Sequence, residues 1–242
     1  MTRFGLIGYP LTHSFSQKYF TEKFQREGID AVYEKFPIPS IDQLPLVLKK
    51  HTDLAGLNVT IPHKENVLSY VNERSDVVKK IGACNCISIR NGKLAGHNTD
   101  VIGFRDSLQQ IISTIPAKAL ILGTGGAAKA VEFVLKQMKI PYRFVSRKPS
   151  ANALSYEQLT PRTINEAKLI INTTPLGMHP QIVEAPPIPY DGIDSLHILY
   201  DVIYNPEKTL FLQKGESRGA TIKNGLEMLL IQAEESWKVW NA

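Results

Sequence analysis

Lys118-Ala119-Leu120-Ile121-Leu122-Gly123-Thr124-Gly125-Gly126-Ala127-Ala128 is the most informative stretch of the 242-residue sequence. Its apolar first half predicts a buried strand that runs directly into a glycine-rich turn. Apolar residues at helical spacing follow from Ala130 to Met138, and Pro141 separates them from a second predicted strand, Tyr142 to Val145. Strand, glycine turn, helix and strand in this order form the unit that binds dinucleotides.

The glycine turn has the residue types that a pyrophosphate requires. Small residues at Gly123, Gly125 and Ala128 let the backbone approach the phosphates, and the N-terminus of the following helix faces their charge. The second strand is followed by Ser146-Arg147-Lys148, where an NAD site has a carboxylate for the ribose hydroxyls. Two cations and a hydroxyl instead fit the 2'-phosphate of NADP. In isolation the basic pair would be interpreted as a solvated turn, but not at this position in this unit.

The first half of the chain alternates predicted strands with predicted helices. The strands are Phe4 to Gly8, Ala31 to Phe36 and Ala55 to Ile61, and Asn91-Gly92 predicts a hairpin that finishes the sheet with an antiparallel edge. We therefore expect an α/β protein in which one domain has a mainly parallel sheet and the other is of the Rossmann type.

A polar cluster ends the third of these strands, at Asn58-Val59-Thr60-Ile61-Pro62-His63-Lys64. Asn58 and Thr60 share one face of the strand, and the proline takes the chain out of the sheet and delivers Lys64 at the strand's exit. On its own, Lys64 is best interpreted as a solvated charge. Asp100 has two interpretations, a helix cap or a carboxylate that pairs with Lys64 to hold and move a proton.

Ser14 and Ser16 stand at the start of a predicted helix that runs to Glu27. Ser16 as the N-cap accounts for the pair structurally. Two hydroxyls near a helix N-terminus also suit a carboxylate ligand. Their spacing supports the two hypotheses equally.

Composition narrows the classes of function. The chain is 43% hydrophobic and 21% charged with a net charge of +5, and no basic run exceeds a pair, which mildly favours small anions and argues against nucleic acid. Cys84 and Cys86 would point to the same side of a strand. We interpret them as small buried hydrophobes, and we expect no disulfide and no metal. Neither a cleavable leader nor a membrane-spanning run is found, so a cytoplasmic location is expected.

These motifs, taken in order, resemble shikimate dehydrogenase along nearly the whole chain. The segments that carry the resemblance are Gly8-Tyr9-Pro10, His13-Ser14-Phe15-Ser16, Asn58 to Lys64, Gly82-Ala83-Cys84-Asn85, Gly96-His97-Asn98-Thr99-Asp100, Gly123 to Ala128, Asn172-Thr173-Thr174-Pro175, Asp201 to Pro206, and Asn224-Gly225-Leu226 leading to Gln232. The chain departs from the family pattern at Gln17, Cys86 and Ser146 and is short between Lys148 and Lys168.

The resemblance implies an oxidoreductase that reversibly reduces 3-dehydroshikimate to shikimate with NADPH, a step toward chorismate and the aromatic amino acids. It implies that Lys64 carries the proton with Asp100 as its partner. The residues expected at the substrate are Ser14 and Ser16 at its carboxylate, and Asn58, Thr60, Lys64, Asn85, Asp100, Tyr204 and Gln232 around its ring and hydroxyls. The residues expected at NADP are Asp76, Gly123, Thr124, Gly125, Gly126, Ala127, Ser146, Arg147, Lys148, Thr173, Val202 and Gly225.

The predicted domains are a substrate-binding and catalytic domain at residues 1–101, rejoined by the C-terminal helix 225–242, and an NADP-binding Rossmann-like domain at residues 102–224. The expected partners are small molecules, without nucleic acid or membrane, and the chain is expected to be a monomer or a homodimer. One alternative function is a quinate/shikimate dehydrogenase of broader substrate or NAD use. The missing acidic residue after Val145 counts against NAD only. The other alternative is a non-catalytic dinucleotide-binding regulator, which we would expect to lack Lys64 or Asp100.

Overall fold

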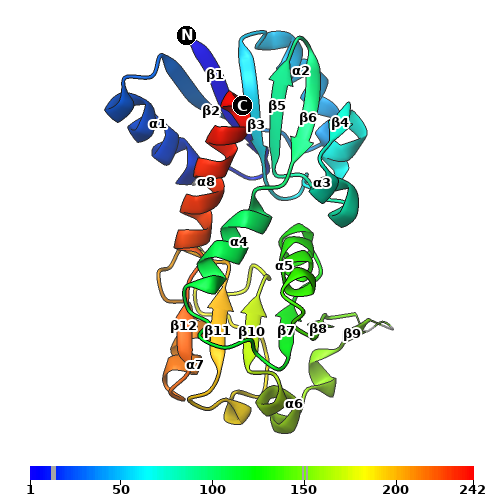
Figure 1. Ribbon diagram of the computed structural model, residues 1–242, viewed down its shortest axis with the longest axis vertical. Coiled ribbons are helices and arrows are strands. Elements are labelled where there is room, and N and C mark those ends of the chain that lie inside the picture. Colours follow the sequence, from blue (N-terminus) through cyan, green and yellow to red (C-terminus); the bar gives the residue numbers. More distant parts are fainter. Residues whose placement is uncertain (12–14, 149, 151) are drawn as a thin grey trace. The chain divides into compact units, whose positions relative to one another are not determined.

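Two six-stranded sheets organise the described part of the chain, one in each of two units (Figure 1). The structure is a computed structural model that describes residues 1–11, 15–148, 150 and 152–242. Unit 1 comprises Met1–Thr99 and Ala233–Ala242, and unit 2 comprises Asp100–Gln232. The predicted domains have their limits at residues 101 and 225, and the assignment of substrate and cofactor to these domains stays a prediction.

The sheet of unit 1 has the strand order β2-β1-β3-β5-β6-β4. Its strands are β1 (Thr2–Gly8), β2 (Ala31–Pro37), β3 (Leu54–Val59), β4 (Glu73–Arg74), β5 (Cys86–Arg90) and β6 (Lys93–His97). The helices of this unit are α1 (Phe15–Glu27), α2 (Leu44–Lys50), α3 (Asp76–Ile81) and the second part of α8 (Leu226–Asn241). β1 pairs in parallel with β2 and β3, and β4 pairs in parallel with β6, whereas β5 is antiparallel to both of its neighbours.

The expected mainly parallel sheet and the expected hairpin are therefore confirmed. The hairpin turns at Asn91 and Gly92, whose φ values of 50° and 74° are the left-handed ones that this dipeptide adopts readily. The expectation that the hairpin forms the edge of the sheet is wrong. The short strand β4 pairs with β6 and is itself the edge.

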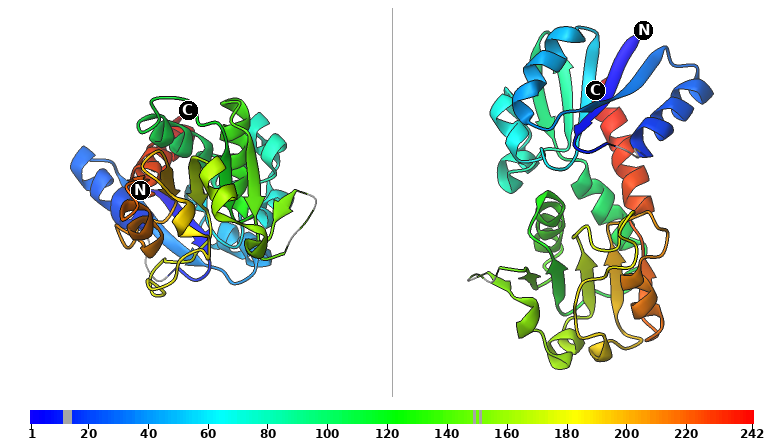
Figure 2. Two further views of the ribbon diagram at one scale, coloured as in Figure 1. Left: turned by 90° about the horizontal axis from the view of Figure 1, so that it is seen from below. Right: turned by 180° about the vertical axis from the view of Figure 1, so that it is seen from behind.

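Helices lie on both faces of this sheet (Figure 2). Each face has its own apolar core. Phe4 and Leu6 of β1 pack with α1 and α8, whereas Ile7 packs with α2 and α3, as the alternation of side chains along a strand requires. Trp240 of α8 lies over Gly56 of β3, where a Cβ atom would be only 2.4 Å from the indole ring. The Trp240 Nε1 also donates to the Ile87 carbonyl at 3.1 Å, so the end of α8 is fixed to this sheet.

Two local expectations in unit 1 are wrong. Ser16 is the second residue of α1, which begins at Phe15, so it is not the N-cap. Cys84 lies in the core with α2 and α3, whereas Cys86 lies in the core with α1 and α8, so the thiols are on opposite faces of the sheet. The alternation rule does not apply to them, because Cys84 precedes β5 and is outside the strand. Both are buried thiols without a disulfide, as expected.

The sheet of unit 2 has the strand order β12-β11-β10-β7-β8-β9, and all its pairs are parallel. Its strands are β7 (Ala119–Leu122), β8 (Tyr142–Val145), β9 (Ala153–Leu154), β10 (Leu169–Asn172), β11 (Ile198–Asp201) and β12 (Thr221–Lys223). Its helices are α4 (Asp100–Gln109), α5 (Gly126–Gln137), α6 (Pro161–Glu166), α7 (Leu210–Glu216) and the first part of α8. The Rossmann-type sheet that the glycine turn predicts is therefore confirmed.

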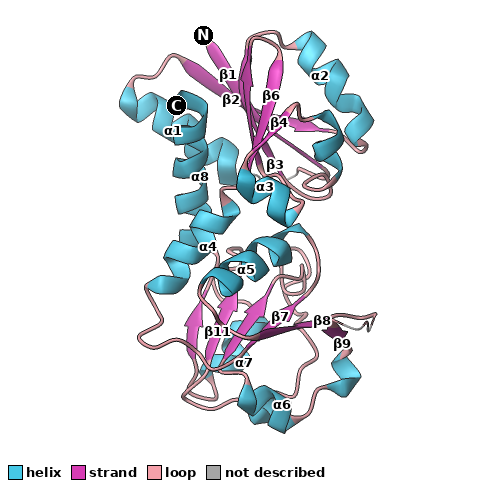
Figure 3. Cartoon of the chain, turned by 45° about the vertical axis from the view of Figure 1, so that its right-hand side comes forward, coloured by secondary structure: helices cyan, strands magenta, loops and turns pink. Residues whose placement is uncertain are grey.

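Helices cover both faces of this second sheet (Figure 3). Helices α4 and α5 lie on one side and α6 and α7 on the other. Phe104 of α4 packs edge-on against Tyr200 of β11, with ring centroids 5.0 Å apart, whereas Ile164 of α6 and Phe211 of α7 belong to the opposite core. Among the described residues, no helix is both long and apolar enough to cross a membrane.

Candidate functional site

The strand order of unit 2 reverses between β7 and β10, and ligands of open parallel sheets bind at such a reversal, beyond the carboxyl ends of the strands. The loop after β7 begins at Gly123, and the loop after β10 begins at Thr173. Thr173 donates to the Leu122 carbonyl twice, from its N–H at 2.9 Å and from its Oγ1 at 2.7 Å. These bonds hold the two loops together at the position where a dinucleotide is expected.

The glycine turn requires glycine at its first position. Gly123 has a φ of 107°, and a Cβ atom there would be 2.7 Å from Thr173 Oγ1. Gly125 is the N-cap of α5 in an extended conformation, and no atom lies within 4 Å of its missing Cβ. The N–H groups in the first turn of a helix have no acceptor within the helix, so the start of α5 offers donors to an anion. The backbone of this turn therefore fits a pyrophosphate.

The basic segment Ser146-Arg147-Lys148 follows β8, the neighbour of β7 in the sheet. Ser146 is tied to β9 because its N–H donates to the Leu154 carbonyl at 2.9 Å, and its Oγ accepts from the Lys148 N–H at 3.3 Å. Arg147 and Lys148 are exposed. The turn thus presents two cations at the carboxyl end of β8.

Asp201, at the end of β11, anchors two loops of the predicted cofactor site. Its carboxylate accepts from Thr209 Oγ1 at 2.6 Å, from the Ile203 N–H at 3.0 Å and from Asn172 Nδ2 at 3.1 Å. Asn172 in turn accepts from Thr174, at 2.6 Å from its Oγ1 and 3.0 Å from its N–H. Burial raises the pKa of Asp201 to about 6, and the three hydrogen bonds act against that rise.

Asp201 was expected only as part of the segment that ends at Pro206 and not as a site residue. A carboxylate at the end of a buried strand, directly before a predicted cofactor contact, is the signal that identifies it.

The structure brings Val202 and Gly225 together. A Cβ atom on Gly225 would be 2.1 Å from the Val202 carbonyl oxygen, and the Gly225 N–H donates to the Ile203 carbonyl at 2.9 Å. Tyr204 is partly buried in the same loop after β11. Gln232, at the end of unit 2, is 6% exposed and donates from Nε2 to the Leu229 carbonyl at 3.0 Å.

In unit 1 the chain from Asn58 to Lys64 runs beside Cys84 and Asn85. The Val59 N–H donates to the Asn85 carbonyl at 2.8 Å, and the Cys84 N–H donates to the Lys64 carbonyl at 2.7 Å. These bonds bring together four predicted substrate residues, Asn58, Thr60, Lys64 and Asn85.

His63, directly before Lys64, is buried and hydrogen-bonds through Nε2 to the Ile38 carbonyl at 2.6 Å. Among the described residues its Nδ1 has no partner. Because a backbone carbonyl can only accept, the Nε2 carries the hydrogen and the ring holds the backbone that carries Lys64.

Ser16, Asp100 and Asp76 have different environments. Ser16 is buried and hydrogen-bonds to the hydroxyl of Tyr33, whereas its predicted partner Ser14 lies outside the described residues. Asp100 is a buried residue at the first position of α4 in unit 2. Asp76 is at the start of α3 in unit 1, and its carboxylate accepts from Lys79 Nζ at 3.3 Å.

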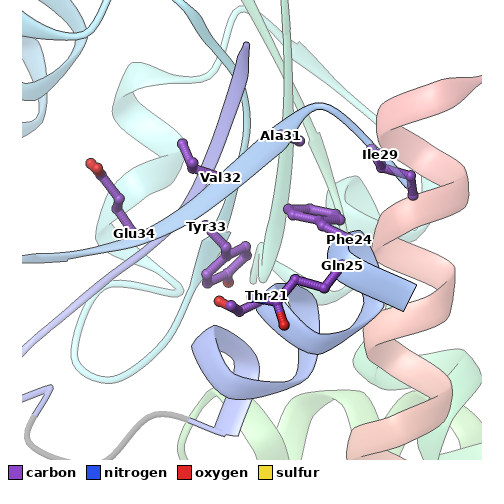
Figure 4. Close-up of a pocket in the computed structure, with 8 residues that line it drawn as sticks. All are labelled: Thr21, Phe24, Gln25, Ile29, Ala31, Val32, Tyr33 and Glu34. Carbon is purple, nitrogen blue, oxygen red and sulfur yellow. The ribbon is translucent and has the colours of Figure 1, made fainter. Parts of the chain in front are cut away.

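A pocket of about 400 Å³ in unit 1 is distinct from these residues (Figure 4). It lies between α1 and β2 and is lined by Thr21, Phe24, Gln25, Ile29, Ala31, Val32, Tyr33 and Glu34. None of these is a predicted site residue. The predicted substrate residues of this unit around the end of β3 are therefore not part of this pocket.

Comparison with known proteins agrees with this geometry. Residues 6–87 match the family model of the shikimate dehydrogenase substrate binding domain. The chain is 36% identical to the shikimate dehydrogenase (NADP(+)) of Caldicellulosiruptor saccharolyticus over 258 aligned residues, which cover 99% of this chain and 92% of the relative.

Solved structures are similar over the same length. The shikimate 5-dehydrogenase of Thermus thermophilus, in complex with NADP(H) and shikimate, is 30% identical with a TM-score of 0.87, covering 99% of this chain and 93% of that one. The shikimate 5-dehydrogenase of Listeria monocytogenes, in complex with shikimate and NAD, is 29% identical with a TM-score of 0.84, covering 100% and 92%.

Proposed function

Because this chain belongs to the shikimate dehydrogenase family, we propose that Lys64 and Asp100 act as the proton-transfer pair of its reaction. The chain is an NADP-dependent oxidoreductase that reversibly reduces 3-dehydroshikimate to shikimate, a step toward chorismate and the aromatic amino acids. The observation that carries this function is the match to NADP-dependent shikimate dehydrogenases over 99% of the chain. The glycine turn, tied to Thr173 and leading into α5, supports it independently.

On the cofactor side, NADPH supplies the hydride when it is bound. The residues proposed to hold its pyrophosphate are Gly123, Thr124, Gly125, Gly126 and Ala127, whose backbone approaches the phosphates. Ser146, Arg147 and Lys148 are proposed to bind the 2'-phosphate, which two cations neutralise. The remaining proposed contacts are Thr173, Val202, Gly225 and, at the nicotinamide end, Asp76.

On the substrate side, Ser14 and Ser16 are proposed to hold the carboxylate. Asn58, Thr60, Asn85, Tyr204 and Gln232 are proposed to surround the ring and its hydroxyls.

When a hydride adds to the carbonyl carbon, the electron pair of the C=O bond moves to oxygen, which then needs one proton. The Lys64 ammonium donates that proton as the charge develops, and the Asp100 carboxylate holds the amine in place. In the direction of shikimate oxidation, the neutral Lys64 amine takes the hydroxyl proton.

The test is oxidation of shikimate with NADP, followed by the absorbance of the reduced cofactor. Lys64→Ala should lower kcat by about 10²- to 10⁴-fold, the usual contribution of a positioned proton donor, while circular dichroism shows an intact fold. Lys80→Ala, which removes an exposed lysine at the end of α3, is the matched control and should leave turnover unchanged. Near-normal turnover by Lys64→Ala would exclude the proposed role.

The same assay with NAD and with quinate separates the alternatives. NAD belongs in it because the Listeria relative is described in complex with NAD. Turnover of quinate with NAD would assign a broader substrate and cofactor range. Binding of NADPH without any turnover of shikimate would instead indicate a regulator.

A cytoplasmic location and a monomeric or homodimeric state complete the proposal. A reducing compartment is proposed because the sequence contains only two cysteines, Cys84 and Cys86. Sedimentation of the purified protein would measure the oligomeric state directly.

A further inference from the structure

A chain of five buried polar side chains crosses unit 1. It runs from Tyr33 of β2 through Asn58 of β3, Ser236 of α8 and Thr99 to Asn85, and each member is at most 5% exposed. Tyr33 donates to Asn58 Oδ1 at 2.8 Å, and Asn58 Nδ2 donates to Ser236 Oγ at 2.9 Å. Ser236 Oγ lies 3.2 Å from Thr99 Oγ1, which accepts from Asn85 Nδ2 at 3.0 Å. Two members, Asn58 and Asn85, are proposed substrate residues, whereas Tyr33 was not predicted to contribute to the site.

The hydrogen bonds determine which way the Asn58 amide points. Its Nδ2 faces the Asn85 carbonyl at 3.4 Å as well as Ser236, and a carbonyl can only accept. Its Oδ1 faces the Tyr33 hydroxyl, which is the donor. If the amide were turned over, two oxygens would face each other at Asn85 and the Tyr33 hydrogen would lose its acceptor. The orientation with Oδ1 toward Tyr33 is therefore strongly preferred.

This orientation limits what Asn58 can offer a ligand. An asparagine amide donates two hydrogen bonds and accepts two. Ser236 and the Asn85 carbonyl take both donors, and Tyr33 takes one acceptor position. Within the described residues the capacity that remains on Asn58 is one acceptor position on Oδ1. Asn58 is thus set to recognise a hydroxyl donor and not a carbonyl.

Tyr33 also connects Asn58 to Ser16. The Ser16 side chain hydrogen-bonds to the Tyr33 hydroxyl, whereas burial raises the pKa of that hydroxyl well above its ordinary value. Tyr33 therefore stays protonated and remains a donor to Asn58 across the working pH range. The Tyr33 hydroxyl therefore links Ser16 of α1, proposed to bind the substrate carboxylate, to Asn58 of β3, proposed to bind a substrate hydroxyl.

We propose that Tyr33 is a positioning residue for the substrate, which orients Asn58 so that its Oδ1 accepts a hydrogen bond from a ring hydroxyl. The inference rests on the proposed placement of Asn58 at the substrate. It adds a residue that need not touch substrate itself, because Tyr33 acts through the amide of Asn58.

Tyr33→Phe removes only the hydroxyl and keeps the ring, which stacks on Phe20 with centroids 4.8 Å apart. The KM for shikimate should rise roughly tenfold, the effect of losing about one well-placed hydrogen bond, while kcat and the KM for NADP change by less than about twofold. Tyr200→Phe is the matched control, because its hydroxyl is also buried and donates to Ser107 Oγ at 2.9 Å in unit 2. It should leave the KM for shikimate unchanged.

A double-mutant cycle distinguishes positioning from general destabilisation. Asn58→Ala alone should raise the KM for shikimate. Adding Tyr33→Phe to it should raise KM by much less than Tyr33→Phe does in the wild type, because Tyr33 then has no amide to orient and only its hydrogen bond with Ser16 is left to lose. Ser236→Ala, which removes the acceptor of Asn58 Nδ2, provides a second variant if Tyr33→Phe folds poorly, and it should raise the same KM.

The outcomes separate this inference from the proposed function. A raised KM in Asn58→Ala together with an unchanged KM in both Tyr33→Phe and Ser236→Ala would overturn the role of Tyr33 alone. Additive effects of Tyr33→Phe and Asn58→Ala would overturn it as well. An unchanged KM in Asn58→Ala would instead contradict the placement of Asn58 at the substrate.

Discussion

Asp201 should make the protein less stable as pH rises, whereas a carboxylate whose pKa is lowered by folding makes a protein more stable. The substitution Asp201→Asn should remove this pH dependence. Asp201 is fully buried at the end of β11, where it accepts hydrogen bonds from Thr209, Ile203 and Asn172. Burial disfavours its charged form more than these donors favour it, and its pKa rises from 3.8 to about 6.

The magnitude follows from the difference between the two pKa values. Below pH 3.8 both the folded and the unfolded states hold the proton, and Asp201 has no effect on stability. As pH rises from there toward 6, the unfolded state loses the proton first, so the free energy of unfolding falls. The whole decrease is about 3 kcal/mol, of which about 1.3 kcal/mol occurs between pH 5 and pH 7.

Urea unfolding followed by circular dichroism at pH 5 and pH 7 measures this effect. The free energy of unfolding of the wild type minus that of Asp201→Asn should fall by about 1.3 kcal/mol between the two pH values. The control is Asp42→Asn, since hydrogen bonds from Tyr70 and Ser40 lower the pKa of Asp42 in the folded state. In the unfolded state its ordinary pKa of 3.8 also keeps it ionised over this range. Its difference from the wild type should not change. A difference for Asp201→Asn that stays constant or grows with pH would refute the argument from burial.

Two further substitutions test the cofactor side. Arg147→Ala should raise the KM for NADPH by roughly tenfold or more and that for NADH by less than about twofold, because only NADPH has the 2'-phosphate. An equal rise in KM for both cofactors would contradict the assignment of Arg147 to the 2'-phosphate. The control is Arg218→Ala, which removes an exposed arginine elsewhere in unit 2 and should leave both KM values unchanged. Gly225→Ala should destabilise the protein by about 1–3 kcal/mol and weaken NADP binding, because the new Cβ would be 2.1 Å from the Val202 carbonyl. Thermal unfolding measures the loss of stability. The control is Gly125→Ala, which should retain stability because no atom lies within 4 Å of the new Cβ. Equal melting temperatures of the two variants would contradict the steric argument.

Local signals in the sequence were sufficient for most of the secondary structure. The Asn91-Gly92 turn and the glycine turn at Gly123 both depend on residues adjacent in the chain. The same is true of the order of β7, α5 and β8, from which the parallel sheet of unit 2 was expected. Predicted site residues that lie just after a strand, such as Arg147 after β8, were predicted from that order alone.

Expectations failed where distant segments decide the environment. The alternation rule placed Cys84 and Cys86 on one face, but the structure has them on opposite faces, because β5 begins at Cys86 and Cys84 is outside the strand. The short strand β4 carries no apolar pattern, and only its pairing with β6 makes it the edge of the sheet. Ser16 is two positions past the cap position, since α1 begins at Phe15.

The sequence by itself determined the two α/β units, the glycine turn after β7 and the basic segment after β8, because these are set by the spacing of apolar, small and charged residues along the chain. Only the tertiary structure decided the environment of the polar side chains. Asn58 hydrogen-bonds to Tyr33 and Ser236, which are 25 and 178 residues away in the sequence. A local sequence pattern cannot predict contacts across such separations. The raised pKa of Asp201 has the same origin, since it depends on which atoms exclude water and which donors remain. Hydrogen-bond orientation and desolvation are properties of the packed fold, and they appear only when distant segments meet.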